Sequence, residues 1–143
     1  MSADPIGETD LDVLLASMEP ALQAGTYFFC TVPREATSDE LATAVATFRE
    51  AEGTTLVLAE ADAIAMHQVL RSPMAWITLT VHSSLDAVGL TGAVAGCLGD
   101  EAISCNVIAA FHHDHLFVPV ARAHDAIRAL TRLSAASLPD GKE

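Results

Sequence analysis

The chain has 143 residues, 51% of them hydrophobic, and carries a net charge of −12. This length suits one domain or two small ones, and the apolar content is too high for a disordered chain. Nineteen acidic residues against seven basic ones argue against a nucleic-acid or anionic-membrane partner, because such partners require a clustered basic face.

The N-terminus and the cysteines indicate the compartment. Residues 1–10 are acidic and polar, and they lack the basic and apolar stretches of a secretory signal. No apolar run approaches the roughly 20 residues that a membrane span needs. The three cysteines are odd in number and show no CxxC spacing, which suits buried, reduced thiols. We therefore expect a cytoplasmic protein that has no membrane partner.

Apolar residues in the first half recur at helical or strand spacing. Leu11, Leu14 and Met18 share one helical face after Thr9, a candidate N-cap, and Pro20 closes that segment. The patterns further along predict a strand over 26–32, a loop or short helix over 34–43, a hairpin that turns at Glu52-Gly53, a helix over 60–67 and a loop over 71–73. That last loop is the expected boundary between two halves.

The second half has clearer periodicity. Ile77, Leu79 and Val81 alternate with polar residues, which predicts a strand over 76–82 with one buried face. The elements that follow are a helix over 86–99 with the apolar stripe Ala87, Leu90, Val94 and Leu98, a strand over 103–111, a turn at 112–114, a strand over 115–120 and a helix over 123–133. Pro119 cannot donate to a ladder, so its strand is expected to lie at an edge or to end there.

The order of elements is βββα and then βαββα, in two halves of similar size. The second order is most of a ferredoxin-like unit, so we expect an α+β fold. Gly92 and Gly96 lie four residues apart on the predicted helix, where each interior glycine costs about 0.5–1 kcal/mol relative to alanine. Such a cost suggests close backbone contact with a sheet or with a second copy, and it predicts self-association.

A polar turn, His82-Ser83-Ser84, joins the strand over 76–82 to the next helix. Ser83 or Ser84 would accept a backbone N–H as a helix cap, and Asp86 would suit the positive end of the helix dipole. Spare backbone N–H groups just past such a cap can also hold a carboxylate or a phosphate. Capping alone and ligand binding are both open interpretations, and they are compatible.

The run His112-His113-Asp114-His115 consists of metal-ligand types. On an extended strand His113 and His115 would point to the same face, which makes a two-histidine clip conceivable. However, the run lies in a predicted hairpin turn, and no distant cysteine or glutamate pattern completes the ligand set. We expect solvated or ligand-facing turn residues here and no metal site.

Motifs of catalysis and cofactor binding are missing from the sequence. His82, Ser83 and Asp86 are too close in sequence to form a hydrolase triad, whose members come from separate elements, and no GxSxG elbow occurs. There is no P-loop, dinucleotide-binding GxGxxG or HExxH motif. We therefore expect a protein that is not an enzyme and that holds no cofactor.

The second half carries a family resemblance. The segment ITLTVHSSLDAVGLTGAVAGCLGDEAISCNVIAAFHHDHLFVP resembles an ACT domain, the small ligand-binding module of amino-acid metabolism. More narrowly, the chain is similar to small bacterial tandem-ACT proteins of unassigned function. The motifs that carry the likeness are FREAEGTTLVL at 48–58, HSSLDAVGLT at 82–91 and HDHLFVP at 113–119. The likeness covers the chain from about Leu11 to Leu133.

The resemblance implies two ferredoxin-like βαββαβ units of the ACT type, with antiparallel sheets and helices on one face. They would occupy residues 1–72 and 73–136, followed by a disordered tail at 137–143. Such proteins are often dimeric and bind an amino acid near the first strand–helix turn. No convincing strand follows Leu133, so the last strand of the second unit is either missing or supplied by the first, and the sequence leaves both alternatives open.

By this analogy the ligand lies at the turn after residue 82. The lining residues would be His82, Ser83, Ser84, Val88, Gly89, Leu90 and Thr91. The ammonium group of an amino acid also needs an acceptor, and Asp86, Asp114 or a strand carbonyl would serve. The leading hypothesis is a non-enzymatic sensor that binds an amino acid. The alternatives are a metal-dependent protein or enzyme that uses residues 112–115, and a structural dimerisation module without a ligand.

Overall fold

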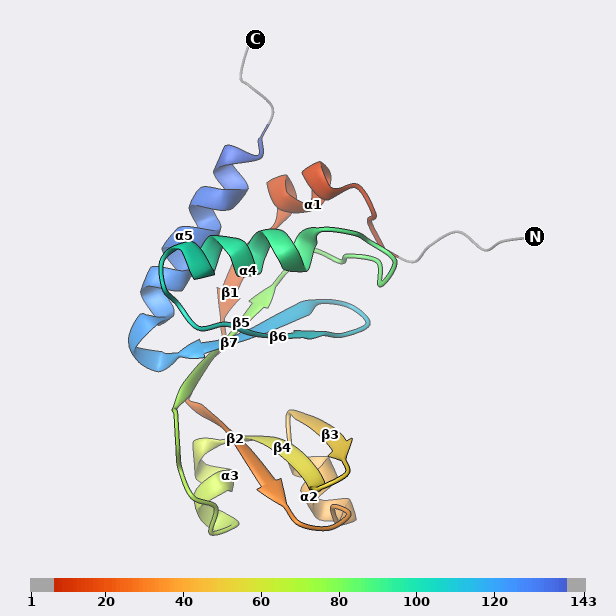
Figure 1. Ribbon diagram of the computed structural model, residues 1–143, viewed down its shortest axis with the longest axis vertical. Coiled ribbons are helices and arrows are strands. Elements are labelled where there is room, and N and C mark those ends of the chain that lie inside the picture. The colour runs from red at the N-terminus through yellow and green to blue at the C-terminus, as the bar shows by residue number, and fades with distance from the viewer. Residues whose placement is uncertain (1–6, 139–143) are drawn as a thin grey trace, which may run out of the picture. The chain divides into compact units, whose positions relative to one another are not determined.

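The computed structural model describes residues 7–138, and its contacts divide the chain into two compact units (Figure 1). We call residues Ala24–Ala75 the central unit. Of the described residues, 7–23 and 76–138 together form the terminal unit. No helix in the described part of the chain is both long and apolar enough to cross a membrane.

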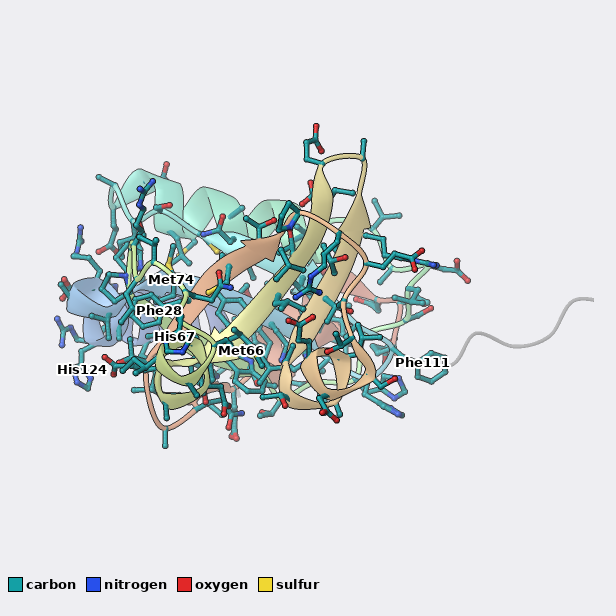
Figure 2. The ribbon with its side chains drawn as sticks, turned by 90° about the horizontal axis from the view of Figure 1, so that it is seen from below. Phe28, Met66, His67, Met74, Phe111 and His124 are labelled. Atoms are coloured by element: carbon teal, nitrogen blue, oxygen red, sulfur yellow. The ribbon has the colours of Figure 1, made fainter. Side chains whose placement is uncertain are left out.

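The central unit has the βαββαβ order. Its elements are β2 (Tyr27–Val32), α2 (Ser38–Thr43), β3 (Ala46–Glu50), β4 (Gly53–Ala59), α3 (Glu60–Ala65) and the first residues of β5 (Met74–Leu79). The strands are antiparallel in the order β3-β4-β2, and Tyr27 of β2 pairs with Met74 of β5. Phe28 belongs to the buried core, against which Met66 packs (both labelled in Figure 2).

A capping box starts α2. Thr37 accepts the Glu40 backbone N–H at 3.1 Å, and the Glu40 side chain accepts the Thr37 N–H at 2.8 Å. Arg34 holds both oxygens of the same carboxylate, at 2.8 and 2.9 Å. The hydrogen bond from Arg34, followed by that from the Thr37 backbone, lowers the pKa of Glu40 to about 2. These local bonds make the polar stretch 34–43 a short helix after a loop.

The terminal unit also combines an antiparallel sheet with helices. Its elements are α1 (Leu11–Ser17), β1 (Pro20–Leu22), the rest of β5, α4 (Leu90–Asp100), β6 (Asn106–Ala109), β7 (Asp114–Pro119), the 3₁₀ turn η1 (Val120–Arg122) and α5 (Ala123–Ala136). The strand order is β1-β5-β7-β6, and the helices lie on one side of these strands (Figure 1). Fully buried Ile77, Leu98, Leu116 and Leu130 come from both layers. Strands and helices therefore share one core.

The last strand of the terminal unit comes from the beginning of the chain. β1 runs antiparallel to β5, with Pro20 opposite Leu79 and Leu22 opposite Ile77. The Gln23 N–H continues this ladder to the Trp76 carbonyl at 2.8 Å. Of the two alternatives that the sequence left open, the strand is therefore supplied by the first half of the chain, as β1. A three-residue strand directly after a helix carries too short a pattern to be predicted from sequence.

The contacts therefore divide the chain differently from the predicted boundary between residues 72 and 73. Residues 7–23 group with the second half, because both α1 and β1 contact α5. Of the predicted tail at 137–143, the structure describes two residues, Ser137 and Leu138. Their N–H groups bond to carbonyls of the last turn of α5, at 3.1 and 3.2 Å. Residues 139–143 lie outside the described part.

The helix α4 starts later than the predicted residue 86. Gly89 adopts a left-handed conformation with φ of +103° immediately before Leu90, the first helical residue. Ser84 does accept a backbone N–H, from Asp86 at 3.0 Å, but within a turn that precedes the helix. The prediction that Ser83 or Ser84 caps this helix was therefore wrong. The cause is that the helical spacing from Ala87 onward continues through residues that are not yet helical.

Two smaller predictions also need correction. The N-cap of α1 is Asp10, whose Oδ1 accepts the Val13 N–H at 3.2 Å, rather than Thr9. β7 lies between β5 and β6 and is therefore an interior strand. Pro119 is its last residue, so the strand ends at the proline, as one of the two predicted outcomes required.

The β3–β4 turn provides a test of the central unit. Gly53 has a φ of +148°, and a Cβ on it would lie 2.1 Å from the carbonyl oxygen of Val32. Gly53→Ala should therefore lower the free energy of unfolding by about 1–3 kcal/mol, the usual cost of overpacking. Gly25→Ala is the matched control, because its φ is +96° but its Cβ would meet nothing closer than 3.8 Å. Denaturant titration that finds equal losses in the two variants would contradict the steric argument.

Candidate functional site

A cavity of about 320 Å³ lies in the terminal unit, where the segment after β5 leads into α4. One wall is the segment 83–91, and the other is the β6–β7 hairpin. The lining residues are Ser83, Ser84, Leu85, Ala87, Val88, Gly89, Leu90, Thr91, Ala109 and Asp114.

Most of the residues predicted from sequence therefore meet at one cavity. His82 and Asp86 do not line it. Three lining residues were not predicted: Leu85 and Ala87, which lie between predicted residues, and Ala109, which pairs with Asp114 across the hairpin. The alternation of β6 and β7 predicts the hairpin itself, but the register that places Ala109 opposite Asp114 comes only from the structure.

Asp114 is the buried acid of this site. It is 7% exposed, and its Oδ2 accepts a hydrogen bond of 3.2 Å from the hydroxyl of Ser83, which is 8% exposed. No other hydrogen bond to this carboxylate is found within residues 7–138. A buried carboxylate with a single neutral donor is poorly compensated, so a cationic group in the cavity would be stabilised by it.

The start of α4 offers the opposite charge preference. The first N–H groups of a helix have no partner within the helix, and they carry its positive dipole end. In α4 no side chain caps these groups, and the first turn contains no acidic residue. Gly89 at the N-cap keeps the approach to Leu90 and Thr91 free of a side chain. The arrangement can accept a carboxylate within the same cavity that holds Asp114.

His82 lies beside the cavity wall but turns to other aromatic rings. Its ring centroid lies 5.3 Å from that of His112 and 6.3 Å from that of Phe111. Phe111 is 54% exposed and projects outward (Figure 2). The His82 Nε2 atom is buried and has no hydrogen-bond partner in the described part of the chain. His82 thus belongs to a cluster at the β6–β7 turn rather than to the cavity.

His115 is engaged on the strand. Its Nδ1 accepts the Trp76 indole N–H at 3.0 Å and lies 3.0 Å from the Thr78 hydroxyl. This nitrogen must therefore be unprotonated, with the proton of the neutral ring on Nε2. Burial lowers the pKa of His115 below its usual value, and the nearby charge of His113 adds to the decrease, while Asp114 opposes it. The neutral imidazole is the form that fits this network.

The two-histidine clip that the sequence made conceivable is not assembled. The His113 and His115 ring centroids lie 6.4 Å apart with perpendicular planes. The Nδ1 atom of His113 lies 3.4 Å from the Val81 carbonyl, and that of His115 is taken by Trp76. Within residues 7–138, no group of three or more histidine, cysteine, aspartate or glutamate side chains is arranged to hold a metal ion.

Two family models match consecutive parts of the chain. Both are described as an ACT domain, and they cover residues 6–73 and 71–132. Among curated protein sequences, none matches this chain significantly.

Solved structures show the same fold. A Vibrio cholerae protein of unknown function, described as a possible transport protein, is 48% identical, with a TM-score of 0.77 over 87% of this chain and 95% of its own. An Agrobacterium tumefaciens protein is 19% identical, with a TM-score of 0.67 over 82% and 89% of the two chains. The regulatory subunit of aspartate kinase from Thermus flavus is 10% identical, with a TM-score of 0.58 over 80% and 96%.

Trp76 is the single tryptophan of the chain, so its fluorescence reports on His115. The unperturbed pKa of a histidine is about 6.5. Because the pKa of His115 is lowered, the fluorescence should change with pH at a midpoint below this value. Below that pH the unfolded chain binds a proton at this histidine before the folded chain does, so acidification lowers the free energy of unfolding. In a pH titration, His115→Gln should remove the midpoint. A midpoint above 6.5, or one unchanged in the variant, would refute the assignment.

Proposed function

This chain belongs to the ACT-domain family, and from that premise we propose that its terminal unit binds an amino acid in the cavity at the start of α4. Membership of the family supports a ligand-binding regulatory module. The choice of an amino acid rests on one observation: a poorly compensated buried carboxylate and an uncapped helix N-terminus face one cavity. A zwitterion supplies the two charges that these groups favour.

In this proposal the two ends of the ligand are recognised separately. Its carboxylate accepts backbone N–H groups around Leu90 and Thr91, at the positive end of α4. Its ammonium group donates to Asp114, which keeps the bond from Ser83. The side chain would contact Leu85, Val88 and Ala109, the apolar part of the lining. A cavity of about 320 Å³ suits a small ligand.

We further propose that the site binds its ligand without chemical change. No histidine lines the cavity, and Ser83 is bonded to a carboxylate rather than to a general base. Burial raises the pKa of Cys30, Cys97 and Cys105, which disfavours a thiolate at neutral pH. These unpaired cysteines also suit the reducing cytoplasm that we expect for this protein.

The proposal can be tested at Gly89. A Cβ there would lie 2.9 Å from Cδ2 of Leu11, and the φ of +103° disfavours any side chain. Micromolar affinity corresponds to about −8 kcal/mol. Ligand at 100 times its dissociation constant adds about 2.7 kcal/mol of stability, which raises the melting temperature by several degrees. We expect one or more of the twenty amino acids to stabilise the wild type in this way, and to stabilise Gly89→Val much less.

Gly25→Val is the control, because it carries the same positive-φ strain outside the terminal unit. It should lose stability but keep the full ligand-induced shift. The proposal fails if no amino acid stabilises the wild type, as a purely structural module would behave, or if folded Gly89→Val is stabilised equally. Loss of tens of degrees on chelation would instead favour a metal-dependent protein.

We propose, in addition, that the chain forms a homodimer through α4. A groove of about 550 Å³ runs between α4 and α5, and Gly92, Gly96 and Ala129 are among its lining residues. A Cβ on Gly92 or Gly96 would meet nothing within 4 Å, so contacts inside the described chain do not explain these glycines. Asp100 lies at the acidic end of α4, and an antiparallel second α4 would bring a positive helix N-terminus towards it.

Dimerisation is tested by filling the groove. Gly96→Gln should raise helix propensity by roughly 0.5 kcal/mol and leave the monomer folded, but block the second copy. Light scattering over a hundredfold dilution should give a dimer mass for wild type and a monomer mass for this variant. Gly99→Gln is the matched control, since Gly99 is on α4, equally unobstructed and outside the groove lining. A strictly monomeric wild type at high concentration would disprove the dimer.

A further inference from the structure

One wall of the cavity is formed mostly by an irregular segment, residues 81–89, between β5 and α4, and we call this segment the wall. Such a segment orders only if other parts of the chain hold it. Within residues 7–138 this segment makes few hydrogen bonds to other segments. On one side Ser83 bonds to Asp114 and Val81 lies near His113. On the other side every such bond is made by one residue near the N-terminus.

That residue is Glu8, which pairs with the turn like a short parallel strand. Its N–H donates to the His82 carbonyl at 2.9 Å, and its carbonyl accepts the Ser84 N–H at 2.8 Å. The two bonds flank Ser83, whose hydroxyl contacts Asp114. The Glu8 side chain does not reach the turn, because its Oε1 accepts the N–H groups of Thr9 and Asp10.

The neighbours of Glu8 show how closely this segment approaches the wall. Gly7 has a φ of +94°, and a Cβ on it would lie 2.8 Å from the Ser84 nitrogen and 3.0 Å from the His82 oxygen. Both atoms belong to the backbone and cannot swing aside, so a glycine is needed at this position. Leu11, the first residue of α1, reaches Gly89 at the other end of the wall.

From these contacts we propose that residues Gly7–Leu11, which we call the strap, hold the wall of the amino-acid site in its binding conformation. Glu8 and Gly7 are positioning residues: they do not line the cavity, but they fix Ser83 and Ser84, which do. The inference rests on the proposed function of the cavity. Without the strap, the ligand must order the wall as it binds. Its apparent affinity is then the intrinsic affinity multiplied by the fraction of molecules in which the wall is already ordered.

Binding and strap docking are then linked in both directions. Because a ligand favours the ordered wall, it favours the docked strap by the same factor. The strap continues into α1, where the Ala16 carbonyl accepts the Ser134 hydroxyl of α5 at 3.3 Å. Occupancy of the cavity therefore changes the stability of the N-terminal segment, which gives the site an output that does not require movement of the sheet.

The test compares Gly7→Ala with Gly25→Ala. Both place a Cβ at a φ near +95°, but the nearest atoms to the Cβ at residue 25 belong to the Tyr27 side chain, at 3.8 Å or more. Two quantities are measured on each full-length protein: the exchange rate of the Ser84 N–H by NMR, and the melting temperature with each of the twenty amino acids. Glu8→Pro, which removes the donor to His82, is a second route to the same loss.

We expect Ser84 to exchange faster in Gly7→Ala and Glu8→Pro, and the amino acid that stabilises the wild type to be needed at roughly tenfold higher concentration. Gly25→Ala should match the wild type in both respects. Unchanged exchange, or an unchanged ligand requirement in a folded Gly7→Ala, overturns the role of the strap. If no amino acid stabilises the wild type, the proposed function fails, and the exchange rates still decide whether the strap orders the wall.

Discussion

The pairing of β1 with β5 is the constraint on which the terminal unit depends. It joins residues about 60 positions apart, and it gives β5 a partner on the side that β7 leaves open. An unpaired edge strand would expose a row of backbone donors and acceptors. The same pairing fixes the position of α1 and of the strap before it, because only four residues lie between the last residue of α1 and the last residue of β1. The site is therefore assembled from both ends of the sequence, and its order depends on contacts that close a long loop.

In the terminal unit, charge and burial decide which kind of ligand the cavity can hold. Asp114 has lost most of its hydration and has gained one neutral hydroxyl donor in return. The first turn of α4 has donors but neither a side-chain cap nor an acidic residue. A chain with a net charge of −12 would repel simple anions at long range, whereas a zwitterion is neutral overall. This difference favours an amino acid over a free phosphate at the same helix end.

The sequence predicted much of this arrangement, for reasons that differ between elements. Leu90, Val94 and Leu98 have the helical spacing of a buried stripe, and all three are buried in α4. The turn at Glu52-Gly53 was predictable because glycine there supplies the positive φ. The start of α4 was not, because Ala87 extends the helical spacing into residues that a left-handed Gly89 keeps out of the helix. His82 was grouped with the serines by adjacency, although its ring points to Phe111 and His112.

Non-local features escaped prediction because periodicity describes one segment at a time. Nothing in the residues Gly7 and Glu8 indicates that they pair with a turn some 75 positions later, and β1 is too short to show an alternation.

The position of the cavity on α4 also bears on the proposed regulatory role. A ligand shifts a protein only by its difference in affinity for two states. The cavity and the α4–α5 groove both lie along one helix of about 16 Å. In the proposed dimer, a ligand bound at the first turn of α4 would therefore contact the same helix whose glycines pack against the second copy.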